Sequence, residues 1–152
     1  MWQFTEQFKR MERWHERMKV IYKKVPKDMG DLADEDDVLA FFQNCYHLKD
    51  WIKNDTNSGL SASEVKNFVH ASEILKLCGG LCNGSKHLKI DDPSFDKNIR
   101  INRHFYLPRG GHIIGRSFVI TSKGNEYDAL ELANKCVDEW KDFFKNKGMS
   151  WS

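Results

Sequence analysis

The helical spacing of the apolar residues is the feature that most constrains the fold of this chain. In four segments, apolar side chains recur three and four positions apart, as they do on the buried face of an α-helix. The predicted helices cover about residues 1–25, 34–54, 62–82 and 128–146. Their predicted buried faces consist of Phe4, Phe8, Met11, His15, Met18, Tyr22 and Val25, then Val38, Phe41, Cys45, Leu48 and Ile52, then Val65, Phe68, Val69, Ser72, Leu75, Cys78 and Cys82, and finally Leu130, Ala133, Val137, Trp140 and Phe144. Helices of this kind with mostly short connections predict a mainly all-α protein, an up-down four-helix bundle.

The ends of the predicted helices carry their own signals. Pro26 ends the first helix, because the residue before a proline avoids the α conformation. The acidic run 34–37 suits the positive end of a helix dipole at the start of the second. Ser61 and Glu64 have the spacing of a capping box, and Gly148 can take the left-handed conformation that closes the last helix.

The helical repeat is lost between about residues 90 and 125. Two stretches there, 99–106 and 112–121, are rich in β-branched and aromatic residues and are joined around Pro108 to Gly111. We therefore predict a small β-hairpin inserted before the last helix. A length of 152 residues is typical of one domain, so we treat 1–152 as a single unit.

Composition narrows the class of protein further. The chain is 40% hydrophobic and 30% charged, which suits a globular core and excludes a chain that is disordered throughout. Its apolar runs fall short of the roughly 20 residues that cross a bilayer, and its first residues lack the pattern of a signal peptide. We expect a cytoplasmic protein that does not enter a membrane. In that compartment the four cysteines are expected to be reduced core residues.

Charge is unevenly distributed, although the net charge is only +2. Residues 83–123 carry eight Lys and Arg against three Asp, with aromatic residues between them. The side chains in question are Lys86, Lys89, Lys97, Arg100, Arg103, Arg109 and Arg116, with His104, Phe105, Tyr106 and His112. Basic groups neutralise phosphates and aromatic rings stack on unpaired bases, so this region is a candidate surface for single-stranded RNA. The alternative is a solvated basic hairpin.

Three metal- or phosphate-binding patterns are incomplete. Glu12 and His15 have the spacing found in di-iron helical bundles, but the chain has no second Glu-x-x-His, and a histidine at the edge of the core is the better interpretation. Cys78, Cys82 and His87 lack a fourth zinc ligand at a recognisable spacing, whether Cys45, Cys136 or His47, which favours core cysteines. The glycine-rich segment 79–86 has its lysine and serine in the wrong order for a P-loop. We expect neither a metal ion nor a cofactor.

A dense polar group follows the third helical face. Asn83 and His87 are four positions apart, with Lys86 between them. Imidazole transfers protons near neutral pH, the carboxamide can orient a phosphate, and the ammonium can balance its charge. These residues therefore form a candidate catalytic site. They are also the residue types that an ordinary helix C-terminus favours, so that interpretation stays open.

This group resembles the motif of the HEPN superfamily, whose ribonucleases carry an arginine, a polar residue, three variable residues and a histidine late in a helix. Asn83 matches the polar position and His87 the histidine, while Cys82 stands at the position of the arginine. The resemblance implies a helical homodimer with two motifs in a shared cleft. It also implies metal-independent RNA cleavage in bacterial defence or toxin–antitoxin systems. RNA or a nucleotide is then the expected ligand.

Further candidates lie on the second predicted helix. His47 and Asp50 are three positions apart, so the carboxylate can orient the ring, or the two form an exposed polar pair. If the second and third helices are antiparallel neighbours, His47 is expected to lie away from His87 within one protomer. Five aromatic residues fall off the predicted seams and either face a partner or widen the core: Trp2, Trp14, Phe42, Tyr46 and Trp51. The alternative function is therefore a non-catalytic module that binds another protein, which Cys82 in the arginine position supports.

Overall fold

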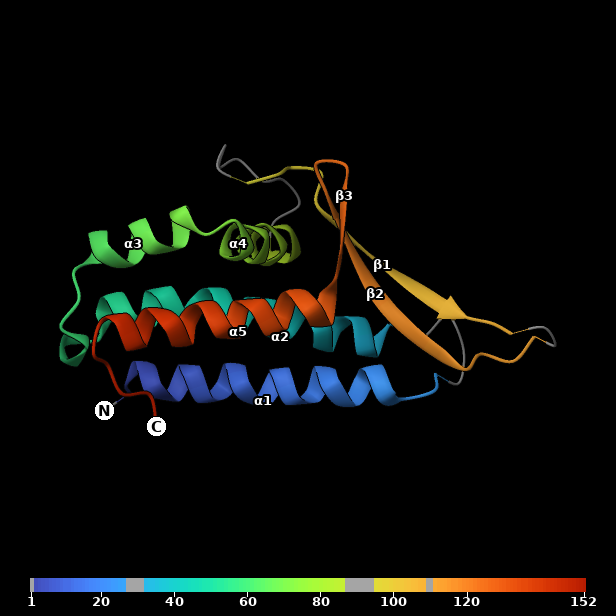
Figure 1. Cartoon of the computed structure of the whole chain (residues 1–152), viewed down its shortest axis with the longest axis horizontal. Helices are drawn as coiled ribbons and strands as arrows, with labels where there is room; N and C mark the ends of the chain where they lie inside the picture. The colour runs from blue at the N-terminus through green and yellow to red at the C-terminus, as the bar shows by residue number, and fades with distance from the viewer. Residues whose placement is uncertain (1, 27–31, 87–94, 109–110) are drawn as a thin grey trace.

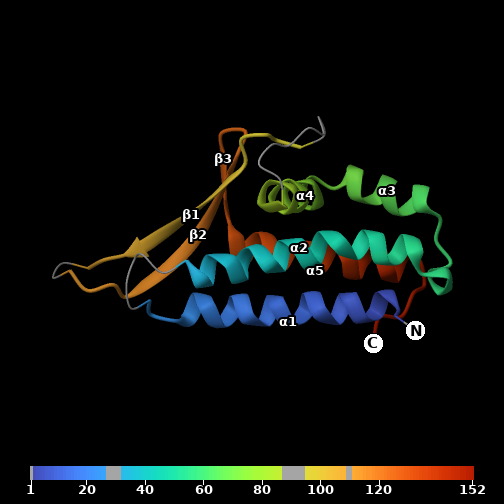
Figure 2. The ribbon, with the colours of Figure 1, turned by 180° about the vertical axis from the view of Figure 1, so that it is seen from behind.

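The protein is mainly helical, with a small antiparallel sheet at one end. The structure, a computed structural model, describes residues 2–26, 32–86, 95–108 and 111–152. Within these ranges the elements are α1 (Phe4–Lys23), α2 (Ala33–Asn54), a 3-10 turn (Thr56–Ser58), α3 (Ala62–Ala71), α4 (Glu73–Lys86), β1 (Arg100–Tyr106), β2 (Gly115–Ser122), β3 (Asn125–Asp128) and α5 (Ala129–Asn146). The long helices α1, α2 and α5 lie side by side, and the sheet extends from one end of them (Figures 1 and 2).

The predicted seams of α1, α2 and α5 form the core. All five predicted positions of α2 are fully buried, and Phe8 and Phe144 pack with their ring centroids 5.5 Å apart. One prediction was wrong: Val25 is 57% exposed, because α1 ends at Lys23, before the proline. Phe42, which lies off the predicted seam, is fully buried and widens the core, one of the two interpretations that the sequence left open, because α4 packs over that side of α2.

The predicted third helix is two helices, which corrects the boundary 62–82. The capping box of Ser61 and Glu64 starts α3 as predicted, but the chain leaves the helical conformation at Ser72. The Ser72 side chain accepts a hydrogen bond from the backbone of Leu75 and so begins α4. In Figure 1 α4 is seen end-on, because it runs across the long helices instead of alongside them.

The predicted hairpin is present, and a third strand that was not predicted extends it, within the described residues, into a three-stranded sheet. β1 pairs with β2 antiparallel, with Ile101 opposite Ile120 and Phe105 opposite Arg116. β3, which the sequence did not predict, pairs with β2 after a two-residue turn. Both turn residues, Lys123 and Gly124, have positive φ, as a type I′ turn requires.

Buried polar contacts anchor this sheet to the helices. Arg116 of β2 is 3% exposed and forms an ion pair with Asp34 at the start of α2. The Tyr22 hydroxyl of α1 donates to Asp128 Oδ1 at 2.9 Å and accepts from the backbone N–H groups of Phe118 and Leu130. We call these contacts the sheet anchor. Arg116 is therefore sealed inside, and its predicted contact with RNA was wrong.

No helix in the described ranges is long and apolar enough to cross a membrane, which agrees with the sequence prediction.

Candidate functional site

Helix α4 crosses α2 at close range. The Cys78 thiol donates to the carbonyl of Phe42 at 3.2 Å, and Gly79 lies against the ring of Tyr46. A Cβ atom at Gly79 would come within 2.6 Å of both Tyr46 Cε2 and Phe95 Cε1. The crossing therefore depends on glycine at this position, and it brings the end of α4 over the middle of α2.

The crossing joins two groups of residues that the sequence analysis singled out separately. His47 Nε2 lies 3.6 Å from Cys82 Sγ, and Gln43 Nε2 donates to Ser85 Oγ at 2.9 Å. His47 is exposed, Cys82 is buried and Asn83 is half-buried. We call these five residues the α2–α4 junction. The predicted separation of His47 from His87 is not tested, because His87 lies outside the described residues. The structure does place His47 against Cys82, because the break at Ser72 turns α4 across α2.

Several predicted site residues fall outside the described part of the chain. His87, Lys89 and Arg109 are not among the described residues. Lys86 is the last residue of α4, and only its helical backbone is described.

The predicted pair of His47 and Asp50 has other main partners. Asp50 accepts from Lys49 Nζ at 2.8 Å and from Lys53 Nζ at 2.9 Å. Burial raises the pKa of Asp50, but the hydrogen bonds and charges of these two lysines outweigh it and lower the pKa below its ordinary value. The carboxylate is ionised at neutral pH, and Lys49 and Lys53 are ion-pair partners of it within the described part of the chain.

The basic residues of β1 differ in what they can offer a ligand. Arg100 is exposed, whereas Arg103 is half-buried and lies 3.4 Å from the Glu35 carboxylate of α2. The charge of Arg103 is thus partly offset, while that of Arg100 faces solvent. His104 and Tyr106 follow Arg100 on the same face of the strand and are exposed too.

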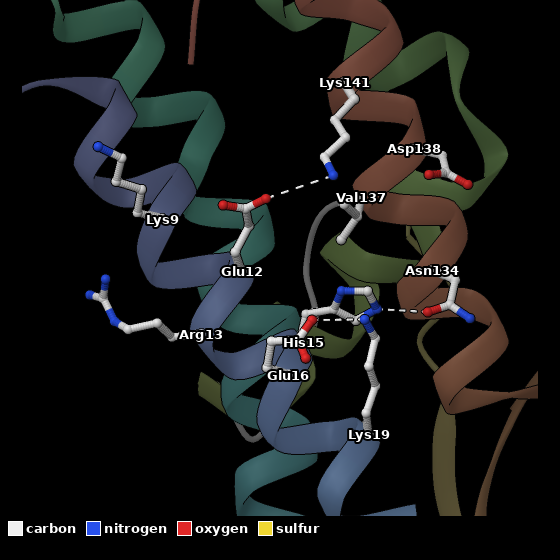
Figure 3. A pocket seen from close by; sticks show the side chains of 10 residues that line it. All are labelled: Lys9, Glu12, Arg13, His15, Glu16, Lys19, Asn134, Val137, Asp138 and Lys141. Carbon is white, nitrogen blue, oxygen red and sulfur yellow. Dashed lines mark hydrogen bonds and ion pairs between the residues drawn. The ribbon is translucent and has the colours of Figure 1, made fainter. Parts of the chain in front are cut away.

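A second polar site lies between α1 and α5, in a groove of about 820 Å³ (Figure 3). His15 lies at the edge of the core, 9% exposed, as the sequence predicts, and its Nε2 is 2.6 Å from Asn134 Oδ1. Glu12 lies on the rim, 3.7 Å from Lys141 Nζ. The charged residues around this groove carry both signs, and four of them form the pairs Glu16–Lys19 and Glu12–Lys141.

One group of potential metal ligands occurs among the described residues. It consists of Cys45, Cys78 and Cys136, all fully buried. The sequence analysis predicted reduced, buried cysteines, which is confirmed. Cys82 is buried too, but it lies outside this group and faces His47.

Two contact residues had no signal in the sequence. Gln43 and Asn134 look like ordinary polar positions on helices, and their partners Ser85 and His15 are 42 and 119 positions away. Such contacts depend on how the helices cross, which periodicity does not report.

Comparison with known proteins identifies no relative. The chain matches no family model, no curated protein and no solved structure. The functional argument therefore depends on the geometry of the described residues and on the motif.

Proposed function

We propose that this protein is a HEPN-like domain that binds RNA or a nucleotide as a homodimer, and that its site lies at the end of α4. The site comprises Asn83, Lys86 and His87 from the motif and His47 from α2. In its active form the domain is a metal-independent endoribonuclease. The proposal includes a four-helix arrangement in which α3 and α4 together take the place of the third helix.

The observation that carries the proposal is the contact between His47 and Cys82. In the resemblance, Cys82 stands where the ribonuclease motif has its arginine. An imidazole 3.6 Å from this thiol puts a group that can be positively charged next to that position. Because His47 is exposed, it is accessible to a ligand as well as to the motif.

Helix α2 connects the site to the sheet. Gln43 and His47 are four positions apart and lie close together on the surface of α2, whereas Glu35 is turned about 120° away from His47 around the helix axis. Gln43 contacts α4 and Glu35 contacts Arg103 of β1. A rise of about 1.5 Å per residue sets Glu35 and His47 about 18 Å apart along the axis.

A single strand of RNA can continue from the α2–α4 junction to β1. There Arg100 supplies a charge for a phosphate and Tyr106 supplies a ring for a base, both from the exposed face of the strand, opposite to the face that carries Arg103. Arg103, paired with Glu35, positions the strand of the sheet and contributes less charge to the ligand.

The chemistry of the active form follows from the residue types. His87 takes the proton from a ribose 2′-hydroxyl, which then attacks the adjacent phosphate, or returns a proton to the leaving oxygen. Asn83 orients the phosphate, and Lys86 together with His47 balances the charge that develops on it. Two imidazoles allow one to act as base and the other as acid.

The experiment measures binding and cleavage of a fluorescent single-stranded RNA by the full chain, with EDTA present. We expect binding that weakens steeply with salt. We expect His87→Ala to abolish cleavage and His47→Ala to reduce binding and cleavage at least tenfold. His70→Ala, which removes an exposed imidazole on α3, is the matched control and should match wild type. Equal activity in wild type and both site variants would remove the proposal.

The alternative is a non-catalytic module that binds a partner protein. It is favoured by large apolar side chains that are more than half exposed where α1 ends, α2 begins and the hairpin projects (Figure 1). They are Val20, Val25, Leu32, Tyr106, Leu107 and Ile114. If the chain binds no RNA and Leu107→Ser with Ile114→Ser alters its state of association, the interaction module is the better assignment.

A further inference from the structure

Three of the four cysteines meet in the centre of the core, although each comes from a different helix. Cys45 of α2, Cys78 of α4 and Cys136 of α5 are fully buried, and their sulfur atoms all lie within 4.8 Å of one another. They are thiols and not disulfides. We call these residues the thiol cluster. Convergence of three soft ligands at one point is the arrangement that thiophilic metal ions use.

The spacing of the cluster fits one ion. Thiolate sulfur binds zinc at about 2.3 Å, and three sulfurs at that distance in a trigonal plane lie about 4 Å apart. Among the described residues the group contains no fourth ligand atom, so the tetrahedral site that structural zinc requires is incomplete. A soft ion that is stable with three sulfur ligands matches the set better.

The surroundings of the cluster include a buried donor in need of an acceptor. Trp140 is 1% exposed, and its indole N–H makes no regular hydrogen bond within the described part of the chain. The Trp140 indole lies beside the Cys45 thiol of the cluster. An unpaired buried donor is costly, and a metal-bound thiolate is the strong acceptor that would satisfy it.

We propose that the thiol cluster is a binding site for a soft, three-coordinate metal ion, with Cu(I) as the ion to test. Each cysteine loses its proton on binding, so three S–H bonds are replaced by three Cu–S bonds, and the protons pass to the buffer. The ion does not change its oxidation state. This site is separate from the α2–α4 junction and does not depend on RNA binding.

Helix α4 offers a route of access to the buried cluster. Gly79 and Gly80 follow Cys78 directly, and Gly84 lies one turn further on. Each glycine inside a helix costs about 1 kcal/mol relative to alanine, so α4 forms a helix of low intrinsic stability. Its local opening exposes Cys78 without unfolding the long helices.

The test is an anaerobic titration of the reduced full chain with Cu(I) against a chromophoric Cu(I) chelator. We expect one tightly held ion per chain, near-ultraviolet absorption from sulfur-to-copper charge transfer, and release of about three protons. We also expect a higher melting temperature, since the ion binds the folded chain. Zn²⁺ should bind at least tenfold more weakly than Cu(I).

Cys136→Ala and Cys78→Ala each remove one ligand and are expected to lower the affinity for Cu(I) at least tenfold. Cys82→Ala removes a buried thiol outside the cluster and is the matched control, expected to bind as wild type does. Near-ultraviolet circular dichroism shows whether each variant is folded, and a serine variant at the same position replaces any alanine variant that is not folded. Unchanged affinity in the cluster variants, or binding only by the urea-unfolded chain, would overturn the proposal.

Discussion

At the start of α2 the Asp34 carboxylate is sealed against Arg116, whereas further along the same helix the His47 imidazole faces solvent beside Cys82. The charged groups of the sheet anchor thus pair with one another inside the protein. The α2–α4 junction leaves polar groups at the surface, where a ligand can reach them. The comparison teaches that the basic character of residues 83–123 is a poor guide to binding, because burial decides which charges remain available.

The largest expected effect comes from Asp34→Asn in the sheet anchor. This change leaves the Arg116 guanidinium buried without its counter-charge, which we expect to cost about 3–5 kcal/mol of unfolding free energy. Urea denaturation measures it. Asp37→Asn, three positions on, breaks the more exposed pair with Arg17 and should cost about 1 kcal/mol or less. Similar losses of unfolding free energy in the two variants would contradict the prediction that the buried ion pair stabilises the fold more than the exposed one.

The same pair predicts how stability depends on acid. Burial raises the pKa of Asp34, but the hydrogen bond and charge of Arg116, with Lys24 nearby, lower it below the ordinary value of 3.8. The unfolded chain therefore takes up this proton at a higher pH than the folded chain does. The stabilisation is complete above pH 3.8 and is lost as the pH falls through the folded-state pKa. Asp34→Asn should lack this component of the acid transition.

A smaller loss is expected from Tyr22→Phe, which tests the other half of the sheet anchor. Burial raises the pKa of Tyr22 far above its ordinary value, so the hydroxyl stays neutral and acts as both donor and acceptor. Removing it leaves the Asp128 carboxylate and two backbone N–H groups short of a partner, at a cost of about 1–3 kcal/mol. Tyr106→Phe removes one long hydrogen bond, to Ser117 Oγ at 3.3 Å, from a side chain that is 55% exposed, and should lower the unfolding free energy by less than about 1 kcal/mol.

Gly79→Ala tests how tightly the α2–α4 junction is packed. The new methyl group would overlap the rings of Tyr46 and Phe95, so we expect a loss of about 1–3 kcal/mol and weaker RNA binding as α4 moves away from α2. Gly80→Ala is the control, because its methyl group meets only the end of the Ile99 side chain at 3.3 Å and gains helix propensity. Equal unfolding free energies of the two variants would mean that α4 can move further from α2 without loss of stability.

The smallest effect on stability is expected from His47→Ala. The side chain is exposed, so its removal should change the unfolding free energy by less than about 0.5 kcal/mol. Its effect on RNA affinity should nevertheless be the largest among the variants that keep the fold intact. If His47→Ala lowered the unfolding free energy as strongly as it lowered RNA affinity, His47 would have a structural role, like the residues of the sheet anchor.

The helices were predictable from the sequence because their apolar residues repeat with a helical period over many turns. The break at Ser72 was not, since the seam continues through it and only the hydrogen bond to Leu75 shows that a new helix begins. β3 was missed because Asn125–Asp128 has few apolar residues, and the turn before it defines the strand.

Of the candidate site, the position of Asn83 near the end of a helix could be predicted from the sequence. The contact of His47 with Cys82 could not, because it depends on a crossing that Gly79 permits. Local patterns in a sequence report which side of a helix is apolar, and they do not report the angle at which two helices cross.

The tight turn at Lys123 and Gly124 makes β2, β3 and α5 one contiguous unit whose pairings are close in sequence. Short loops close quickly and at little entropic cost, so such a unit reaches its native contacts before remote segments meet. The packing of Phe8 on Phe144, by contrast, closes a loop of most of the chain. The unit of β2, β3 and α5 is therefore one of the parts of the chain that are placed to organise early, whereas the packing of α1 on α5 has to wait for remote segments to meet.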